Sequence, residues 1–176
     1  MMWLWFLFAP LTEQQTLLRV TYDIIIVGPE DRLIASMSLN KLNDDRFIIS
    51  CRKDPGGTLF TYWATSEENY LWFPKSGVAF EGAAAEQFGL FPGGPMLSRA
   101  QWISMLNEQP PQQLGDWFIT HQGDWWTLTD QKQSFTVYWR EKKRSVKDNW
   151  RERMFTPRRK PGADIKPLAQ FSEYWR

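Results

Sequence analysis

The chain has few of the side chains that metal sites and nucleophilic catalysis require. Its 176 residues include one cysteine, Cys51, and one histidine, His121. A single cysteine excludes an intrachain disulfide, and no Cys/His pair stands at metal-ligand spacing. We therefore expect no metal site and no cofactor.

The acidic residues do not have the surroundings that acid–base catalysis needs. Adjacent carboxylates fall in predicted turns, where solvation keeps a carboxyl group at its ordinary pKa; these pairs are Glu30-Asp31, Asp44-Asp45 and Glu67-Glu68. The glycine pairs Gly56-Gly57 and Gly93-Gly94 lack the Lys-Ser/Thr of a phosphate-binding loop. Without a plausible nucleophile, base or acid, the sequence predicts a binding protein rather than an enzyme.

The N-terminal apolar run is too short to cross a bilayer as a helix. It begins MMWLWFLFAPL and lacks the basic start of a complete signal peptide. We expect residues 1–16 to be an apolar arm, packed on the domain or on a membrane surface, or the remnant of a longer export signal. No internal repeat or low-complexity tract is present, which argues against a solenoid or propeller.

Aromatic residues are abundant and charge is unevenly distributed. The chain contains 11 Trp and 12 Phe, and its length suits a single domain, here residues 17–176. Residues 1–129 carry 8 basic and 14 acidic groups, a net charge of −6, whereas residues 130–176 carry 13 and 6, a net charge of +7. The basic C-terminal region, 140–161, either pairs with the acidic body or attracts an anionic surface.

Period-two alternation predicts most of the chain to be β-strand. In residues 18–27, Val20, Tyr22, Ile24 and Ile26 share one face, and the same pattern recurs in residues 33–39 and 47–51. Later segments alternate in the same way at 116–120, 125–129 and 134–140. Such neighbours with one apolar face form a curved antiparallel sheet.

The middle of the chain differs from this pattern. A strand is predicted at 58–65, and the strands at 70–73 and 78–81 form a tight hairpin. Both faces of this hairpin carry bulky groups, which is typical of strands that are covered on both sides. A helical insertion at about 83–107 follows, with a short helix over 83–88 and a second that begins at Ser98. Ser98 and Gln101 form a capping box. The fold class is therefore mainly β (α+β), an incomplete curved antiparallel barrel with a short helical lid inserted mid-chain.

This order of elements resembles the Lol-type lipoprotein carriers and receptors of the Gram-negative envelope. The most specific part is the hairpin YLWFPKSGVAFEG, residues 70–82, followed by Gly89-Leu90 and the helix with Trp102 and Leu106. By pattern the similarity covers residues 17–140. It implies a half-barrel over a central helical lid, with an apolar cavity for the acyl chains of lipoproteins. It also implies a place in the periplasm or on the periplasmic face of the outer membrane. No lipobox cysteine stands near this N-terminus.

An acyl-chain cavity needs apolar area and adaptable side chains rather than catalytic groups. We expect lipid acyl chains or a lipoprotein as the ligand, held by residues that share the inward face. Each of these could equally be an ordinary core residue. The predicted lining is Ile24, Met37, Ile49, Trp102, Met105, Trp117, Val137 and Trp139.

Two other functions stay open at this point. One is a structural or adaptor domain of an envelope assembly, which would have a filled core and an aromatic surface for a protein partner. The other is a polysaccharide-binding module that uses Trp125 and Trp126, although adjacent strand residues point to opposite faces. Peripheral membrane contact fits the basic region, whereas nucleic-acid binding is disfavoured because the remainder of the domain is acidic.

Overall fold

The computed structural model describes residues 16–29, 32–53, 55–91, 93–106, 108–132 and 134–171. Apart from residue 16, the predicted N-terminal arm lies outside the described residues. Within the ranges given, no helix is both long enough and apolar enough to cross a membrane.

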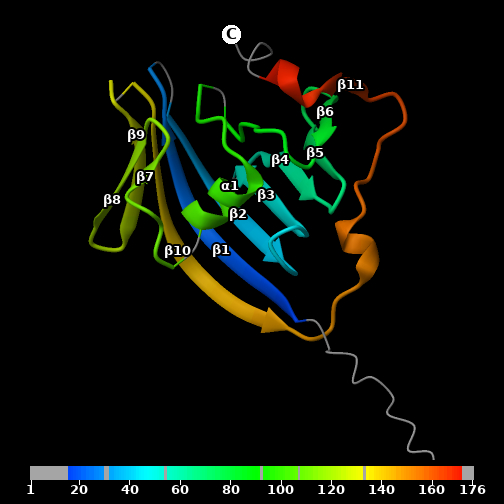
Figure 1. The fold of residues 1–176 in the computed structure, drawn as a ribbon, viewed down its shortest axis with the longest axis horizontal. Coiled ribbons are helices and arrows are strands. Elements are labelled where there is room, and N and C mark those ends of the chain that lie inside the picture. Colours follow the sequence, from blue (N-terminus) through cyan, green and yellow to red (C-terminus); the bar gives the residue numbers. More distant parts are fainter. Residues whose placement is uncertain are drawn as a thin grey trace, which may run out of the picture.

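One open, curved sheet of 11 strands forms the body of the protein, and a short helix lies over its concave face (Figure 1). The strand order is β11-β6-β5-β4-β3-β2-β1-β10-β9-β8-β7. All neighbours are antiparallel except β11 and β6, which are parallel. The strands are β1 (Leu17–Val27), β2 (Arg32–Lys41), β3 (Phe47–Lys53), β4 (Gly57–Ala64), β5 (Glu68–Phe73), β6 (Val78–Ala83), β7 (Gln113–Leu114), β8 (Trp117–Gln122), β9 (Trp125–Asp130), β10 (Thr136–Lys147) and β11 (Asp164–Pro167).

Three short helical elements complete the fold: α1 (Arg99–Met105) and the 3-10 helices η1 (Glu152–Phe155) and η2 (Leu168–Gln170). The sheet does not close on itself, so the predicted fold class, a mainly β incomplete barrel with a helix inserted between two runs of strands, is confirmed.

Alternation along β1 is confirmed, because Val20, Tyr22, Ile24 and Ile26 are all buried in the core on the concave face. β10 pairs with the whole of β1 and continues to Lys147, beyond the predicted end at residue 140. The basic run therefore belongs partly to a strand. Its ladder with β1 contains a bulge at Thr21/Tyr22, and such a bulge bends a strand and increases its twist.

A second core cluster explains the bulky residues on both faces of β4, β5 and β6. Trp63, Tyr70 and Ala79 are buried on the outer face, where Trp150 and Phe155 pack over them. The prediction that the hairpin of β5 and β6 is covered on both sides is confirmed. The cover on the outer face comes from the C-terminal segment, which then adds β11 beside β6.

The predicted helix over residues 83–88 is wrong. Ala83 ends β6, a turn follows, and Phe88 forms a two-way backbone bridge with Leu97. The backbone N–H of Ala83 donates to the Glu86 carboxylate at 2.7 Å, and the Asn69 amide donates to the Ala83 carbonyl at 2.7 Å. These side-chain bonds occupy backbone groups at the start of the segment and hold it in a turn, against its Ala/Glu helix propensity.

We predict that Phe155→Ala lowers the free energy of unfolding by about 3 kcal/mol, because it removes a buried ring from the outer-face cluster. Phe155 is 2% exposed, and its ring lies 5.7 Å from that of Trp150. Urea denaturation measures the effect. The matched control is Ile165→Ala on the sheet edge, 47% exposed, with an expected loss of less than about 1 kcal/mol. Equal losses in the two variants would contradict the packing of this segment on the sheet.

Candidate ligand cavity

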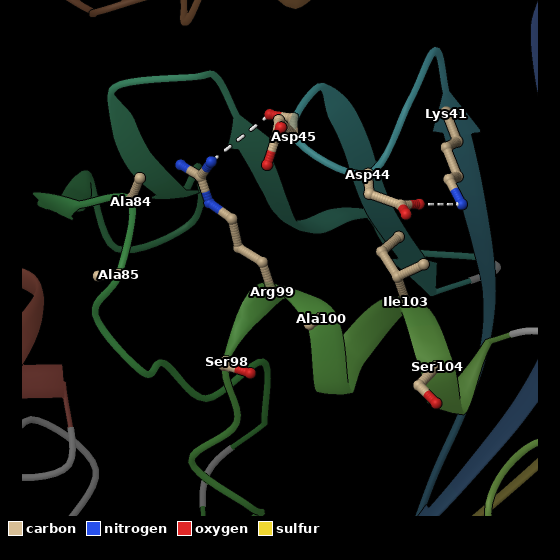
Figure 2. A pocket seen from close by; sticks show the side chains of 10 residues that line it. All are labelled: Lys41, Asp44, Asp45, Ala84, Ala85, Ser98, Arg99, Ala100, Ile103 and Ser104. Atoms are coloured by element: carbon tan, nitrogen blue, oxygen red, sulfur yellow. Dashed lines mark hydrogen bonds and ion pairs between the residues drawn. The ribbon is translucent and has the colours of Figure 1, made fainter.

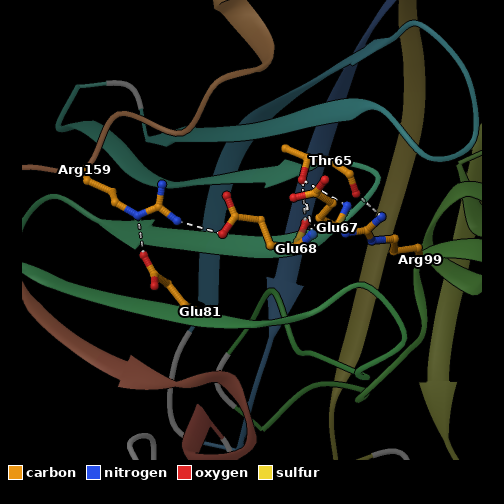
Figure 3. A network of polar contacts seen from close by, with 6 residues as sticks. All are labelled: Thr65, Glu67, Glu68, Glu81, Arg99 and Arg159. Carbon is orange, nitrogen blue, oxygen red and sulfur yellow. Dashed lines mark hydrogen bonds and ion pairs between the residues drawn. The ribbon is translucent and has the colours of Figure 1, made fainter.

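Helix α1 is joined to the sheet through a buried arginine at its first turn. Ser98 caps the helix, and the capping box with Gln101 is confirmed. Arg99 follows directly and is 7% exposed. Its Nε donates to the Asn69 side-chain oxygen at 2.6 Å, and its two terminal nitrogens donate to the carbonyls of Thr65 and Glu68 (Figure 3).

Asn69 is the acceptor at the centre of this contact. It is fully buried on β5, and its Oδ1 also accepts a hydrogen bond from the Tyr62 hydroxyl at 2.6 Å. Its amide nitrogen donates to the carbonyls of Ala83 and Glu86. One side chain thus fixes the turn after β6 and the first turn of the helix at the same time.

The rest of the helix is held by two further buried hydrogen bonds. Trp102 donates from Nε1 to the Phe88 carbonyl at 3.0 Å, and the Tyr22 hydroxyl donates to the Leu106 carbonyl at 2.7 Å. Tyr22 lies on β1, so the end of the helix is connected to the middle of the sheet. The helix is therefore anchored at both ends over the concave face.

An apolar cavity of about 740 Å³ opens on the concave face beside this anchored helix. Its floor consists of buried aromatic and aliphatic side chains, among them Phe60, Phe73 and Phe91. Three of the lining residues are cationic, Arg32, Lys53 and Lys75, and no described lining residue is acidic. The lining residues are Ile26, Gly28, Arg32, Leu33, Lys53, Gly56, Thr58, Leu59, Phe60, Phe73, Lys75, Ser76, Leu90, Phe91 and Phe135.

The structure brings the eight predicted lining residues together in the concave-face core. Seven of them are at most 1% exposed, namely Ile24, Met37, Ile49, Trp102, Met105, Val137 and Trp139, and Trp117 packs against the same cluster. None of the eight lines the 740 Å³ cavity. The cavity walls instead include their neighbours on the same strand faces, such as Ile26 and Phe135. Contact of the eight residues with a ligand stays a prediction.

Sequence reasoning missed the residues at the cavity mouth because they belong to strand ends and turns. Gly56 and the Lys75-Ser76 pair lie in turns that the sequence predicts, but only as chain reversals. Arg32, Lys53 and Lys75 each lie next to such a turn, but charged residues are usual on exposed surfaces, so their positions alone do not mark an opening.

A second, more polar cavity of about 560 Å³ lies at the start of helix α1 (Figure 2). Its charged residues already interact with one another or with the backbone. Lys41 pairs with Asp44 at 2.5 Å, and Arg99 donates to the carbonyl of Asp45 at 3.5 Å. This opening therefore borders the anchor of the helix and presents little apolar surface for an acyl chain. Its other lining residues are Ala84, Ala85, Ser98, Ala100, Ile103 and Ser104.

Buried titratable groups near the core are in environments that favour their neutral forms. Burial raises the pKa of the Cys51 thiol to about 12 and raises the pKa values of Tyr22 and Tyr62. At neutral pH the thiol is therefore protonated and a poor nucleophile. No group of three or more His, Cys, Asp and Glu side chains within the described residues could hold a metal ion.

The two adjacent tryptophans of β9 face opposite sides of the sheet, as the strand geometry requires. Trp126 stacks between His121, with ring centroids 4.2 Å apart, and Trp139 at 6.4 Å. Trp125 lies under the guanidinium of Arg140, which is 4.8 Å from its ring centroid. Both indoles thus have protein partners and do not form one joint platform for a sugar ring.

Comparison with known proteins identifies the fold. No family model matches the chain, and no curated protein matches it. Among solved structures, the chain is similar to a domain from Vibrio parahaemolyticus that is provisionally described as an outer membrane lipoprotein-sorting protein domain. The alignment covers 82% of this chain and 90% of that one, with a TM-score of 0.51 and 9% sequence identity. The chain therefore shares its fold with that domain, and the half-barrel that the Lol-type resemblance implies is confirmed.

We predict that Arg99→Met lowers the free energy of unfolding by about 2–4 kcal/mol, because it leaves several buried acceptors without a donor. Urea denaturation measures this loss. Acrylamide quenching of tryptophan under native conditions should also increase, because Trp102 lies three residues further on in the same helix and is fully buried. The matched control is Arg158→Met, an exposed arginine. Unchanged stability of the Arg99 variant would show that the guanidinium does not anchor the helix.

We predict that Cys51 makes the protein less stable at alkaline pH. Its folded pKa of about 12 lies above the value of about 8.5 for an unfolded thiol, so between these values only the unfolded state releases the proton. Stability should therefore fall with rising pH across this window, by about 1.4 kcal/mol per pH unit from this group. Unfolding free energies at pH 7, 9 and 10 should fall less steeply for Cys51→Ala. Identical slopes would contradict the raised pKa.

Proposed function

We propose that this protein is a non-enzymatic carrier or receptor that binds lipid acyl chains, free or attached to a lipoprotein, in the 740 Å³ cavity. The observation that carries the proposal is the lining of that cavity, which is largely apolar beneath a rim with three cations. Its volume falls within the range of roughly 300–1,000 Å³ that is usual for small-molecule sites. The floor of the cavity is apolar, and charged groups that could bind a polar substrate lie only at its rim.

The free energy available from the cavity supports the same ligand class. Burial of a methylene contributes about 0.8 kcal/mol, so about ten methylenes contribute about 8 kcal/mol before the costs of association are subtracted. Aromatic walls suit such chains because they are rigid and lose little entropy on binding. A structural or adaptor domain would instead have a filled core, so the open apolar volume favours a container.

The proposal places the protein in the bacterial envelope, in the periplasm or on the periplasmic face of the outer membrane. Its support is the fold shared with the Vibrio domain, whose description names lipoprotein sorting. Acyl chains are common to lipoproteins and phospholipids. Native mass spectrometry of delipidated protein with a phospholipid and with a triacylated peptide, offered separately, tells these two ligands apart.

We predict that Leu33→Trp weakens the binding of a fluorescent fatty acid at least tenfold, because the indole fills part of the cavity. The measurement is a fluorescence titration of the delipidated full chain. Ile34→Trp is the matched control: it makes the same kind of change one residue further along β2, on the outer face, where the side chain is 61% exposed. No uptake by the unmodified protein, or an equal loss in both variants, would refute the proposed cavity.

A further inference from the structure

The outer face of the sheet has two halves that differ in their cover. Over β4, β5 and β6 the C-terminal segment packs on buried aromatic residues. Over β2, β1, β10, β9 and β8 the outward side chains include large apolar groups in contact with solvent. Ile34 is 61% exposed, Phe118 39% and Tyr138 36%. Exposed aliphatic and aromatic residues that lie close together on one face indicate an interaction surface.

The strand register brings three of these apolar side chains side by side. Ile25 on β1 is the direct partner of Ile34 on β2 and of Tyr138 on β10. Directly opposed side chains in antiparallel strands are about 5 Å apart, so these three form a continuous row across three strands. Phe118 lies on β8, which is separated from β10 by β9, and its side chain points to the same outer face. We call these four residues the apolar row.

Cations lie on the same face as the apolar row, most of them along β1 and β10 on one side of it. Outward positions of β1, β2 and β10 follow from the register with the buried residues, and for Lys142, at the bulge, from its ion pair with the outward Asp23. Six of these positions are basic, and one of them, Arg32, lies at the strand end where it also borders the cavity mouth. The only acidic residue at an outward position of these three strands is Asp23, which pairs with Arg140 at 3.0 Å and with Lys142 at 3.4 Å. Six cations and one anion give this face a net charge of +5. The six cations, here called the basic face, are Arg19, Arg32, Arg140, Lys142, Lys143 and Lys147.

Four members of the basic face have no ion pair within the described residues, namely Arg19, Arg32, Lys143 and Lys147. Arg32 borders the cavity mouth, whereas Arg19, Lys143 and Lys147 lie on the paired strands β1 and β10, with Lys143 opposite Thr21 and Lys147 opposite Leu17. Long cationic side chains spread in this way suit a diffuse layer of anionic groups better than one precisely placed acceptor.

From these features we propose that the apolar row and the basic face together dock the protein on an anionic membrane surface. The apolar row enters the headgroup region and the cations of the basic face contact lipid phosphates. A single-stranded nucleic acid would need a groove with stacking platforms, whereas this face is convex and half of its apolar row is isoleucine. Charge and apolar content therefore favour a lipid surface.

The docking surface lies next to the mouth of the lipid cavity. Arg32 and Leu33 line the cavity, and Ile34 follows on the outer face. On β1, Ile26 lines the cavity while Ile25 belongs to the apolar row. Docking would thus hold the protein at the membrane with the cavity mouth at the adjacent end of the sheet, on its other face. This last consequence rests on the proposed function, whereas the docking itself does not.

The test is flotation of the full chain with vesicles of phosphatidylcholine alone and with 30% phosphatidylglycerol. We expect binding to the anionic vesicles only, and a steep loss between 50 and 500 mM salt. Arg19→Gln with Lys143→Gln should lower the partition coefficient about 25-fold, because each cation near an anionic surface contributes about fivefold. Ile34→Asp should lower it at least tenfold. Residues 1–15 are common to all variants, so the differences report on the outer face.

Matched control variants test whether membrane binding depends on this face of the sheet. Arg158→Gln with Lys160→Gln removes two exposed cations elsewhere, and Ile165→Asp places the same charge on an exposed edge position. Both should bind within twofold of the unmodified protein. Equal binding to neutral vesicles, an equal loss in the controls, or displacement from vesicles by a single-stranded oligonucleotide would overturn the proposal. Vesicle binding without fatty-acid uptake would overturn the cavity function and leave docking intact.

Discussion

The position of the helix depends on one buried cation, Arg99. Its guanidinium carries five N–H donors in a rigid plane, and in the described residues it meets carbonyl and amide oxygens but no carboxylate. A buried charge is tolerated only when such acceptors replace its water. Glu68 extends the arrangement through the sheet: its carbonyl accepts from Arg99, and its carboxylate pairs with Arg159 at 2.7 Å on the other face (Figure 3). The helix on the concave side and the C-terminal segment on the outer side thus meet at one residue.

Period-two alternation predicted the strands that have one buried face, and it predicted them well. In β1 the apolar positions alternate with polar ones, so both the strand and its inward residues follow from the sequence. Local sequence failed for the segment after β6, where the helix propensity of Ala83 and its neighbours predicted a helix. There the bonds from Asn69 and Glu86 decide the conformation, and a contact between residues 14 positions apart cannot be read from local pattern.

The sequence predicted that the cavity is apolar, but it did not predict which residues line it. Sequence pattern cannot distinguish a cavity-lining residue from a core residue such as Ile24, because both are apolar side chains that point to the concave face. What separates them is whether another element fills the space above. That depends on where the loop with Leu90 and Phe91 crosses the sheet, and the sequence contains no local signal for that crossing.

The uneven distribution of charge has two structural outcomes. Part of the basic C-terminal region neutralises the acidic body, as in the pairs of Arg159 with Glu81 and of Arg144 with Glu108. Part of it extends β10 and leaves unpaired cations along one face. Pairing with the acidic body is therefore confirmed for part of the region, whereas attraction to an anionic surface stays a prediction for the rest.

The open sheet has two free edges, and both are short. β7 has two residues, and β11 has four and ends in Pro167, which has no N–H to offer a further strand. An edge of this length offers few backbone groups for pairing with another chain. The half-barrel can therefore have two open edges without the edge-to-edge aggregation that long exposed edge strands promote.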